Sequence, residues 1–147
     1  MDLKRYWDGV EELLRQNGMD PVRQSDEEGR PYLSVPVTLE GNRLVFTQLC
    51  LSGDSEDTHF LQIYTTIRAE VAADPDRVGA ALARMALQVP MGALGLYAEE
   101  RQVFHKYLLP LSKALPVEEA LRLTGEILGL EWGVAGEYYE RIQSVCD

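Results

Sequence analysis

The side chains best suited to nucleophilic or metal chemistry are few in this chain. It contains two histidines, His59 and His105, and two cysteines, Cys50 and Cys146. A zinc site needs further ligands at short spacing, and neither a Cys-x-x-Cys nor a His-x-x-x-His motif occurs. A Cys50–His105 nucleophilic pair stays conceivable because both residues fall in predicted strands, but a packed thiol is the default for Cys50. We therefore predict no metal ion and no cofactor.

Glutamates occur in four adjacent Glu-Glu pairs, and paired carboxylates are candidates for acid–base catalysis. The pairs are Glu11-Glu12, Glu27-Glu28, Glu99-Glu100 and Glu118-Glu119. Neighbouring residues on a helix or strand point apart, so each pair is better explained as a solvated surface or a helix start. No phosphate loop accompanies them, since no Gly-Lys-Ser/Thr follows the glycines near Gly92. We predict no catalytic residues and no enzyme. The alternative is a small-molecule-binding or hydrolytic site assembled from distant residues: Tyr64, His105 and a carboxylate.

Composition and charge indicate one globular domain, residues 1–147. Hydrophobic residues make up 46% and charged residues 26% of the chain, and the formal net charge is -10. Nucleic acids and anionic membranes repel such a protein unless it carries a basic patch, and the tightest basic pairing is Lys4-Arg5. No apolar stretch has the length of a membrane span or of a signal peptide. We expect a cytoplasmic protein with both thiols reduced, and no nucleic-acid or membrane partner.

Apolar periodicity in the first half predicts one helix and then three strands. Apolar residues recur at helical spacing from Leu3 to Leu14. They then alternate with polar residues in strands at 32–39, 43–51 and 60–71. Pro36 cannot donate to a ladder, so it predicts an edge position or a bulge. Short local connections favour antiparallel pairing of these strands.

The second half predicts a helix, a hairpin and a last helix. Asp74-Pro75 is a cap followed by a proline at the first helical position, and Pro90 ends that helix. A hairpin follows, with strands at 91–97 and 102–111, and the last helix starts near Pro116. The predicted fold is a single α+β domain, α-β-β-β-α-β-β-α, with an antiparallel sheet and helices packed on it.

Glycines recur every fourth residue in the last helix, at Gly125, Gly129 and Gly133. Each interior glycine costs a helix about 0.5 to 1 kcal/mol relative to alanine. Such a ridge permits close approach of another backbone. We expect close packing within the monomer; packing on a helix from another chain and a break in the helix are the alternatives.

The element order and one local pattern resemble a known family. A helix ends in VPMG, the strand GALGLYAEE turns into QVFHKYLLPLS, and Pro116-Val117-Glu118-Glu119 starts the final helix. This pattern is similar to that of the YbjN-like proteins, and the overall order resembles the fold that they share with class I type III secretion chaperones. The resemblance implies a small, acidic, non-enzymatic dimer. In the chaperones, surface apolar patches hold an extended segment of a partner protein.

The residues themselves point to a partner-binding surface. The strand at 43–51 is apolar on both faces, so a sheet covered by helices on one side exposes the other. On that face we predict a protein-binding patch with Leu44, Phe46 and Tyr64, unless a second subunit covers it. The homodimer interface is expected to use three apolar residues of the second half, Met85, Met91 and Leu94. The predicted function is a chaperone-like or regulatory adaptor.

Overall fold

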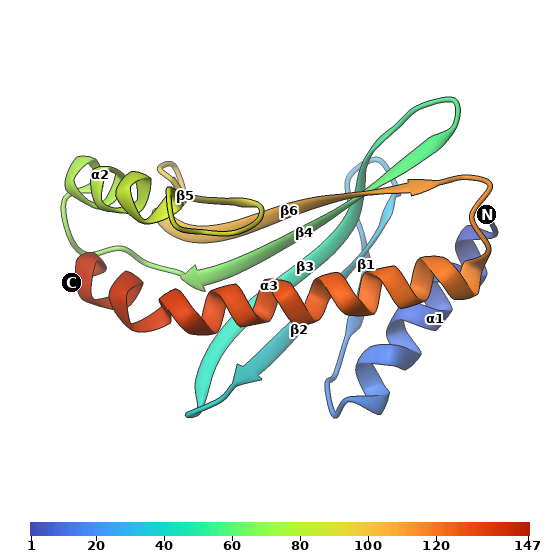
Figure 1. The fold of residues 1–147 in the computed structure, drawn as a ribbon, viewed down its shortest axis with the longest axis horizontal. Helices are drawn as coiled ribbons and strands as arrows, with labels where there is room; N and C mark the ends of the chain where they lie inside the picture. Colours follow the sequence, from blue (N-terminus) through green and yellow to red (C-terminus); the bar gives the residue numbers. More distant parts are fainter.

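Six antiparallel strands form one open sheet, and three helices pack against it in the computed structural model, which describes residues 1–147 (Figure 1). The elements in chain order are α1 (Leu3–Gln16), β1 (Val22–Ser25), β2 (Pro31–Leu39), β3 (Arg43–Asp54), β4 (Thr58–Arg68), α2 (Pro75–Ala86), β5 (Ala93–Tyr97), β6 (Gln102–Ser112) and α3 (Val117–Cys146). The predicted α+β class, the antiparallel sheet and the packed helices are confirmed. None of the helices is both long enough and apolar enough to cross a membrane.

The strand order is β1-β2-β3-β4-β6-β5, so the returning strand β6 lies between β4 and β5. Strand β1 is absent from the predicted order. Its four residues, VRQS, are all exposed and carry no apolar periodicity, so the sequence gives no signal for it. β1 pairs with β2 only as far as Ser34. Pro36 therefore lies where β2 has one neighbour, which confirms its predicted edge position.

Several predicted boundaries were wrong by a few residues. The β3–β4 hairpin is longer than expected, because a bulge between Leu51 and Gly53 lets β3 continue to Asp54. The connection between β3 and β4 is consequently a short turn at residues 55–57. Helix α2 ends at Ala86, four residues before Pro90. Strand β4 ends at Arg68 instead of reaching residue 71.

Helix starts follow the expected capping chemistry. The Asp2 carboxylate accepts a hydrogen bond from the backbone N–H of Arg5, and Asp74 does the same for Arg77. Helix α3 has no side-chain cap after Pro116; Glu118 and Glu119 place negative charge in its first turn. Side-chain caps therefore set the starts of α1 and α2.

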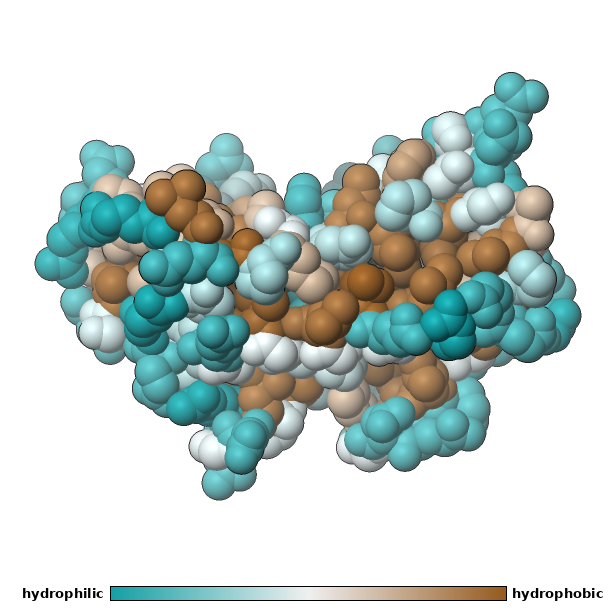
Figure 2. Space-filling model, viewed as in Figure 1, coloured by the Kyte–Doolittle hydropathy of each residue, from teal (hydrophilic) through white to brown (hydrophobic).

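Two apolar clusters make up the core, and both lie on the helix side of the sheet. In the first, α1 and the first half of α3 cover the middle strands. In the second, α2 and the last half of α3 cover the end where β5 and β6 pair. The long α3 crosses in front of β2 and β3 (Figure 1), and it contributes residues to both clusters. In the same view, hydrophobic side chains gather beside α3 and hydrophilic ones line the periphery (Figure 2).

The glycine ridge of α3 does not pack as predicted. A Cβ at Gly125 would contact Leu13 of α1 at 3.3 Å, but Gly129 and Gly133 face open space. The helix is nevertheless continuous through all three positions. Close packing of the whole ridge within the monomer was therefore wrong, and so was the alternative of a break.

Candidate functional site

The two faces of the sheet differ because side chains alternate along each strand. On β3, Val45, Thr47 and Leu49 are buried beneath the helices. The intervening Leu44 and Phe46 point to the opposite side and are 60% and 42% exposed. No helix covers this second side, which we call the open face.

Strand register identifies the residues of the open face. It comprises the following side chains: Val22, Gln24, Tyr32, Ser34, Pro36, Thr38, Leu44, Phe46, Gln48, Cys50, Thr58, Phe60, Gln62, Tyr64, Thr66, Ala93, Gly95, Tyr97, Gln102, Phe104, Lys106, Leu108, Pro110 and Ser112. Lys106 is the single charged residue among them, although the chain carries 38 formally charged side chains, 24 acidic and 14 basic. The open face is thus an apolar and amide-rich surface.

An aromatic pair lies near the centre of the open face. The rings of Tyr64 on β4 and Phe104 on β6 stack with centroids 5.0 Å apart and an interplanar angle of 20°. Phe104 also covers Gly95 on β5, where a Cβ would lie 3.1 Å from its ring. The Tyr64 hydroxyl donates to Oε1 of Gln102 at 3.4 Å. Desolvation raises the pKa of Tyr64, and Tyr97 and Glu100 add to the rise.

A groove of about 740 Å³ crosses the open face. Its walls come from every strand and from the β1–β2 loop: Ser25, Asp26, Glu27, Arg30, Pro31, Tyr32, Gln48, Cys50, Leu51, Ser52, Gln62, Tyr64, Tyr97 and Gln102. Three tyrosines supply rigid apolar area with a polar tip, and three glutamines supply adaptable hydrogen-bonding groups. The groove can therefore bind a ligand through the apolar surface of its tyrosines and the hydrogen bonds of its glutamines.

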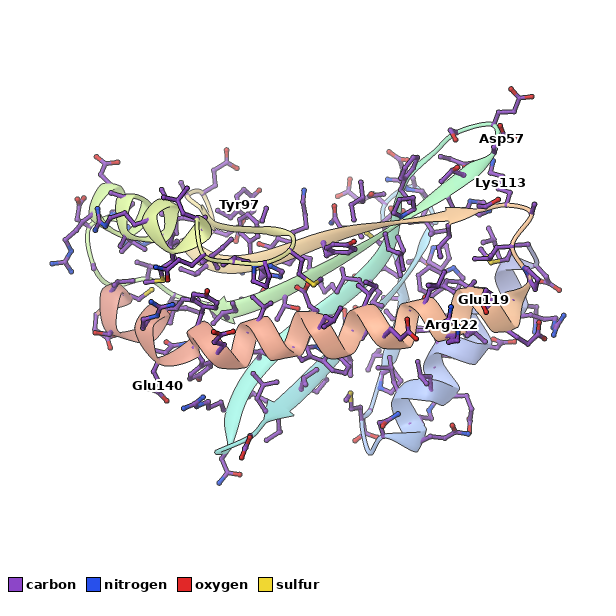
Figure 3. All side chains as sticks on the ribbon, in the orientation of Figure 1. Asp57, Tyr97, Lys113, Glu119, Arg122 and Glu140 are labelled. Carbon is purple, nitrogen blue, oxygen red and sulfur yellow. The ribbon has the colours of Figure 1, made fainter.

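Charge is concentrated on the helix side instead. Along α3, Glu119 and Glu126 both pair with Arg122, and Glu140 pairs with Arg43 at 3.1 Å. Figure 3 shows Glu119, Arg122 and Glu140 spread along this helix. The acidic side chains of the helices therefore keep the protein hydrated without crossing the open face.

All three predicted partner-binding residues, Leu44, Phe46 and Tyr64, lie on the open face. The structure adds two that the sequence reasoning missed, Tyr97 and Leu108, which are 44% and 46% exposed. The missed signal was the alternation in the second hairpin, which places both on the side opposite the buried Val103 and Leu111.

The predicted dimer-interface residues lie in the second core cluster. Leu94 is 9% exposed and belongs to that cluster, and Met85 and Met91 are half-buried against it. Leu94 therefore stabilises the monomer. At the end of α2, Leu87 is 88% exposed, which makes it the most accessible large apolar side chain of this region. The interface role of the three residues stays a prediction.

His105 and Glu131 form a fully buried pair between β6 and α3. Nδ1 of His105 lies 2.8 Å from Oε1 of Glu131, an ion-pair distance with the N–H poorly aligned for a hydrogen bond. Nε2 of His105 lies 2.7 Å from the Met91 carbonyl. Gly92 permits this contact, because its φ is +72° and a Cβ there would lie 2.7 Å from the imidazole.

The pair shifts both of its pKa values upward. Burial alone would lower the pKa of His105, but Glu131 outweighs burial and raises it. Burial raises the pKa of Glu131, and His105 offsets only part of that rise. The folded protein therefore holds protons at this pair to higher pH than the unfolded chain does. Neither residue lines the groove of the open face, and in the described geometry the pair joins α3 to the sheet.

The structure does not bring together the residues of the two catalytic alternatives. Tyr64 and Cys50 lie on the open face, whereas His105 lies on the helix side of the same sheet. A Cys50–His105 pair and a Tyr64–His105 site are therefore both wrong. His59 meets Asp54 at 3.2 Å instead. No group of three or more His, Cys, Asp or Glu side chains is placed to hold a metal ion.

Compared with known proteins, the chain matches no protein-family model, and no curated protein matches its sequence. The open face is therefore the feature on which a function must be argued.

Proposed function

We propose that this protein is a non-enzymatic binding module that holds a segment of a partner protein on its open face. The observation that carries the proposal is the exposed apolar surface of Leu44, Phe46, Tyr97 and Leu108 on a sheet face that no helix covers. Monomeric soluble proteins seldom leave such apolar patches unused. Aromatic residues without interspersed charge are typical of the centre of a protein interface.

The resemblance to secretion chaperones and YbjN-like proteins supports the same reading as an analogy. It implies an adaptor or chaperone-like role for a small acidic protein of this element order. In the proposal, the client segment lies against the Tyr64–Phe104 pair, and the glutamines of the groove bind its backbone.

The proposal also includes a homodimer in a reducing cytoplasm. Leu87, Met85 and Met91 leave apolar surface at the end of α2, away from the open face, where a second copy would dock without blocking the client. Cys50 and Cys146 form no disulfide, which suits a reducing compartment. Mass in solution, measured by light scattering for the wild type and Leu87→Glu, checks the dimer: the variant is expected to be monomeric.

Replacing open-face residues tests the binding role. Phe46→Ser and Leu108→Ser are made together, and Leu130→Ser on α3 is the control, because Leu130 is 55% exposed on the helix side. We expect both proteins to keep the wild-type circular dichroism spectrum. The open-face variant should lose hydrophobic-dye binding and the partner captured from source-cell lysate, while Leu130→Ser keeps both. A folded open-face variant that captures the same partner would overturn the proposal.

A further inference from the structure

Acidic loops bound the open-face groove at both ends, and this charge pattern selects among partners. At one end, the β1–β2 loop contributes Asp26, Glu27 and Glu28 against one cation, Arg30. Arg30 is already engaged, at 2.9 Å from Asp26 and 3.3 Å from Glu28. Glu27 lines the groove and takes part in no ion pair, so its charge is free for a ligand.

The other end of the groove lies at the β5–β6 turn. Glu99 and Glu100 follow Tyr97 of the groove wall, and Oε2 of Glu99 accepts a hydrogen bond from the Tyr97 hydroxyl at 3.4 Å. Both carboxylates lie just outside the groove wall, where they line an adjoining hollow with Arg68 and Arg101. The neighbouring cation, Arg101, donates to the carbonyls of Val71 and Ala73, so it is turned toward the chain itself.

The middle of the groove is nearly uncharged. Lys106 is the one cation on the open face and forms no ion pair. The groove therefore has carboxylates in its wall at one end and beside its wall at the other end, with apolar or amide groups between them. A second copy of this chain is a poor occupant, because it would bring a net charge of -10 and the same acidic loops against these ends.

We infer that the groove binds a protein segment with apolar or aromatic side chains in its centre and Lys or Arg at both ends. This inference rests on the proposed function and names the chemistry of its partner. Six strands spaced about 4.8 Å apart make the groove roughly 24 Å long. About seven extended residues span that distance. The segment crosses the strands, so side chains recognise it without addition of a strand to a sheet edge.

Three synthetic peptides test the inference by fluorescence anisotropy with the full-length protein. They share the centre LFALF and differ at their ends: KKLFALFKK, QQLFALFQQ and EELFALFEE. We expect the lysine peptide to bind about five- to tenfold more tightly than the glutamine peptide, and the glutamate peptide to bind most weakly. Added salt should remove the advantage of the lysine peptide, because exposed charges are screened.

A triple variant, Glu27→Gln, Glu99→Gln and Glu100→Gln, should abolish the preference for lysine ends and leave binding of QQLFALFQQ unchanged. The matched control neutralises three exposed carboxylates elsewhere that form no ion pair: Glu12→Gln, Asp20→Asn and Glu137→Gln. It should keep the preference. Circular dichroism establishes that both variants are folded.

Each other outcome has a definite meaning. Equal binding of the three peptides, or equal behaviour of the two triple variants, overturns the charge inference and leaves the apolar open face as the binding surface. If none of the peptides binds, the proposed function fails and the inference with it. If the wild type is a dimer that Phe46→Ser dissociates, a second copy occupies the open face, and the inference is overturned.

Discussion

The helix side and the open face of the sheet are built from the same strands, yet one is buried and the other is exposed. On the helix side, apolar side chains are buried in two continuous clusters, and even the ionisable His105 and Glu131 are enclosed. On the open face, apolar side chains of similar size stay in contact with solvent. Burial by the helices accounts for stability, and the exposed alternate residues are then free to be selected for binding.

Charge separates the two regions as clearly as burial does. The helices carry carboxylates at many exposed positions, and several form ion pairs with arginine within a turn. The open face carries Lys106 alone. Exposed ion pairs contribute little to folding, so the charges of the helices act mainly on solubility. A charge-poor surface on an acidic protein is costly to hydrate, and a partner that covers it relieves that cost.

Removing one member of the buried His105–Glu131 pair should cause the largest loss of stability on the helix side. Glu131→Leu leaves Nδ1 of the buried His105 without its carboxylate, and at about pH 5, where an imidazole is ordinarily charged, it should lower the free energy of unfolding by about 3 to 5 kcal/mol. The double variant with His105→Leu should recover most of that loss. Urea unfolding of the three proteins measures both values. A single variant within about 1 kcal/mol of wild type would show that the pair is unimportant for the fold.

Stability should depend on pH in opposite directions in the wild type and in Glu131→Leu. In the wild type both pKa values are raised. The folded state therefore binds more protons than the unfolded state from the ordinary pKa of Glu upward, through the ordinary pKa of His and beyond it. The contribution of the pair to stability is therefore full at low pH and is lost as pH rises through the raised folded values. In Glu131→Leu, burial alone lowers the pKa of His105, so the sign reverses and stability falls below about pH 6.5. Parallel pH profiles for the two proteins would contradict this account.

Two leucines of β3 sharpen the comparison within one strand. Leu49 is fully buried and Leu44 is on the open face. Leu49→Ala should cost about 2 to 5 kcal/mol, whereas Leu44→Ala should change stability by about 0.5 kcal/mol or less. Thermal and urea unfolding of the two variants provide the test. Similar losses at both positions would mean that the open face is covered in solution.

The smallest expected effect concerns the exposed glycines of α3. Gly129 and Gly133 lie inside a helix, and an added Cβ meets no neighbour within 4 Å. Gly129→Ala and Gly133→Ala should therefore each raise the free energy of unfolding by about 0.5 to 1 kcal/mol. Gly125→Ala is the matched control, because its Cβ would lie 3.3 Å from Leu13 and should gain less. Destabilisation by the first two would show that another surface packs there.

Much of the fold could be predicted from the sequence, and the errors have physical causes. Alternating apolar residues of the three central strands identified both faces, and Asp74-Pro75 located the start of α2. Strand β1 was missed because it is short, polar and exposed. The bulge at Leu51 to Gly53 leaves no local signal, so the end of β3 was misplaced.

The site was only partly predictable. Phe46 and Tyr64 could be assigned to one face because strand alternation is a local property. The buried partner of His105 could not be predicted from the sequence. Glu131 lies on α3, and only the packing of that helix against β6 brings the two side chains together. The groove and its acidic ends likewise depend on strand order. Tyr97 and Glu27 come from opposite edges of the sheet.

Site-specific photocrosslinking tests the binding role of the open face most directly. The photoreactive amino acid p-benzoylphenylalanine replaces Phe46 in one protein and Leu130 in another, and each is irradiated in the source cell. The account predicts a crosslinked product with a different protein from position 46, and no such product from position 130, although Leu130 is the more exposed of the two side chains. Crosslinks to the partner from position 130 alone, or no product from position 46 in a folded protein, would contradict it.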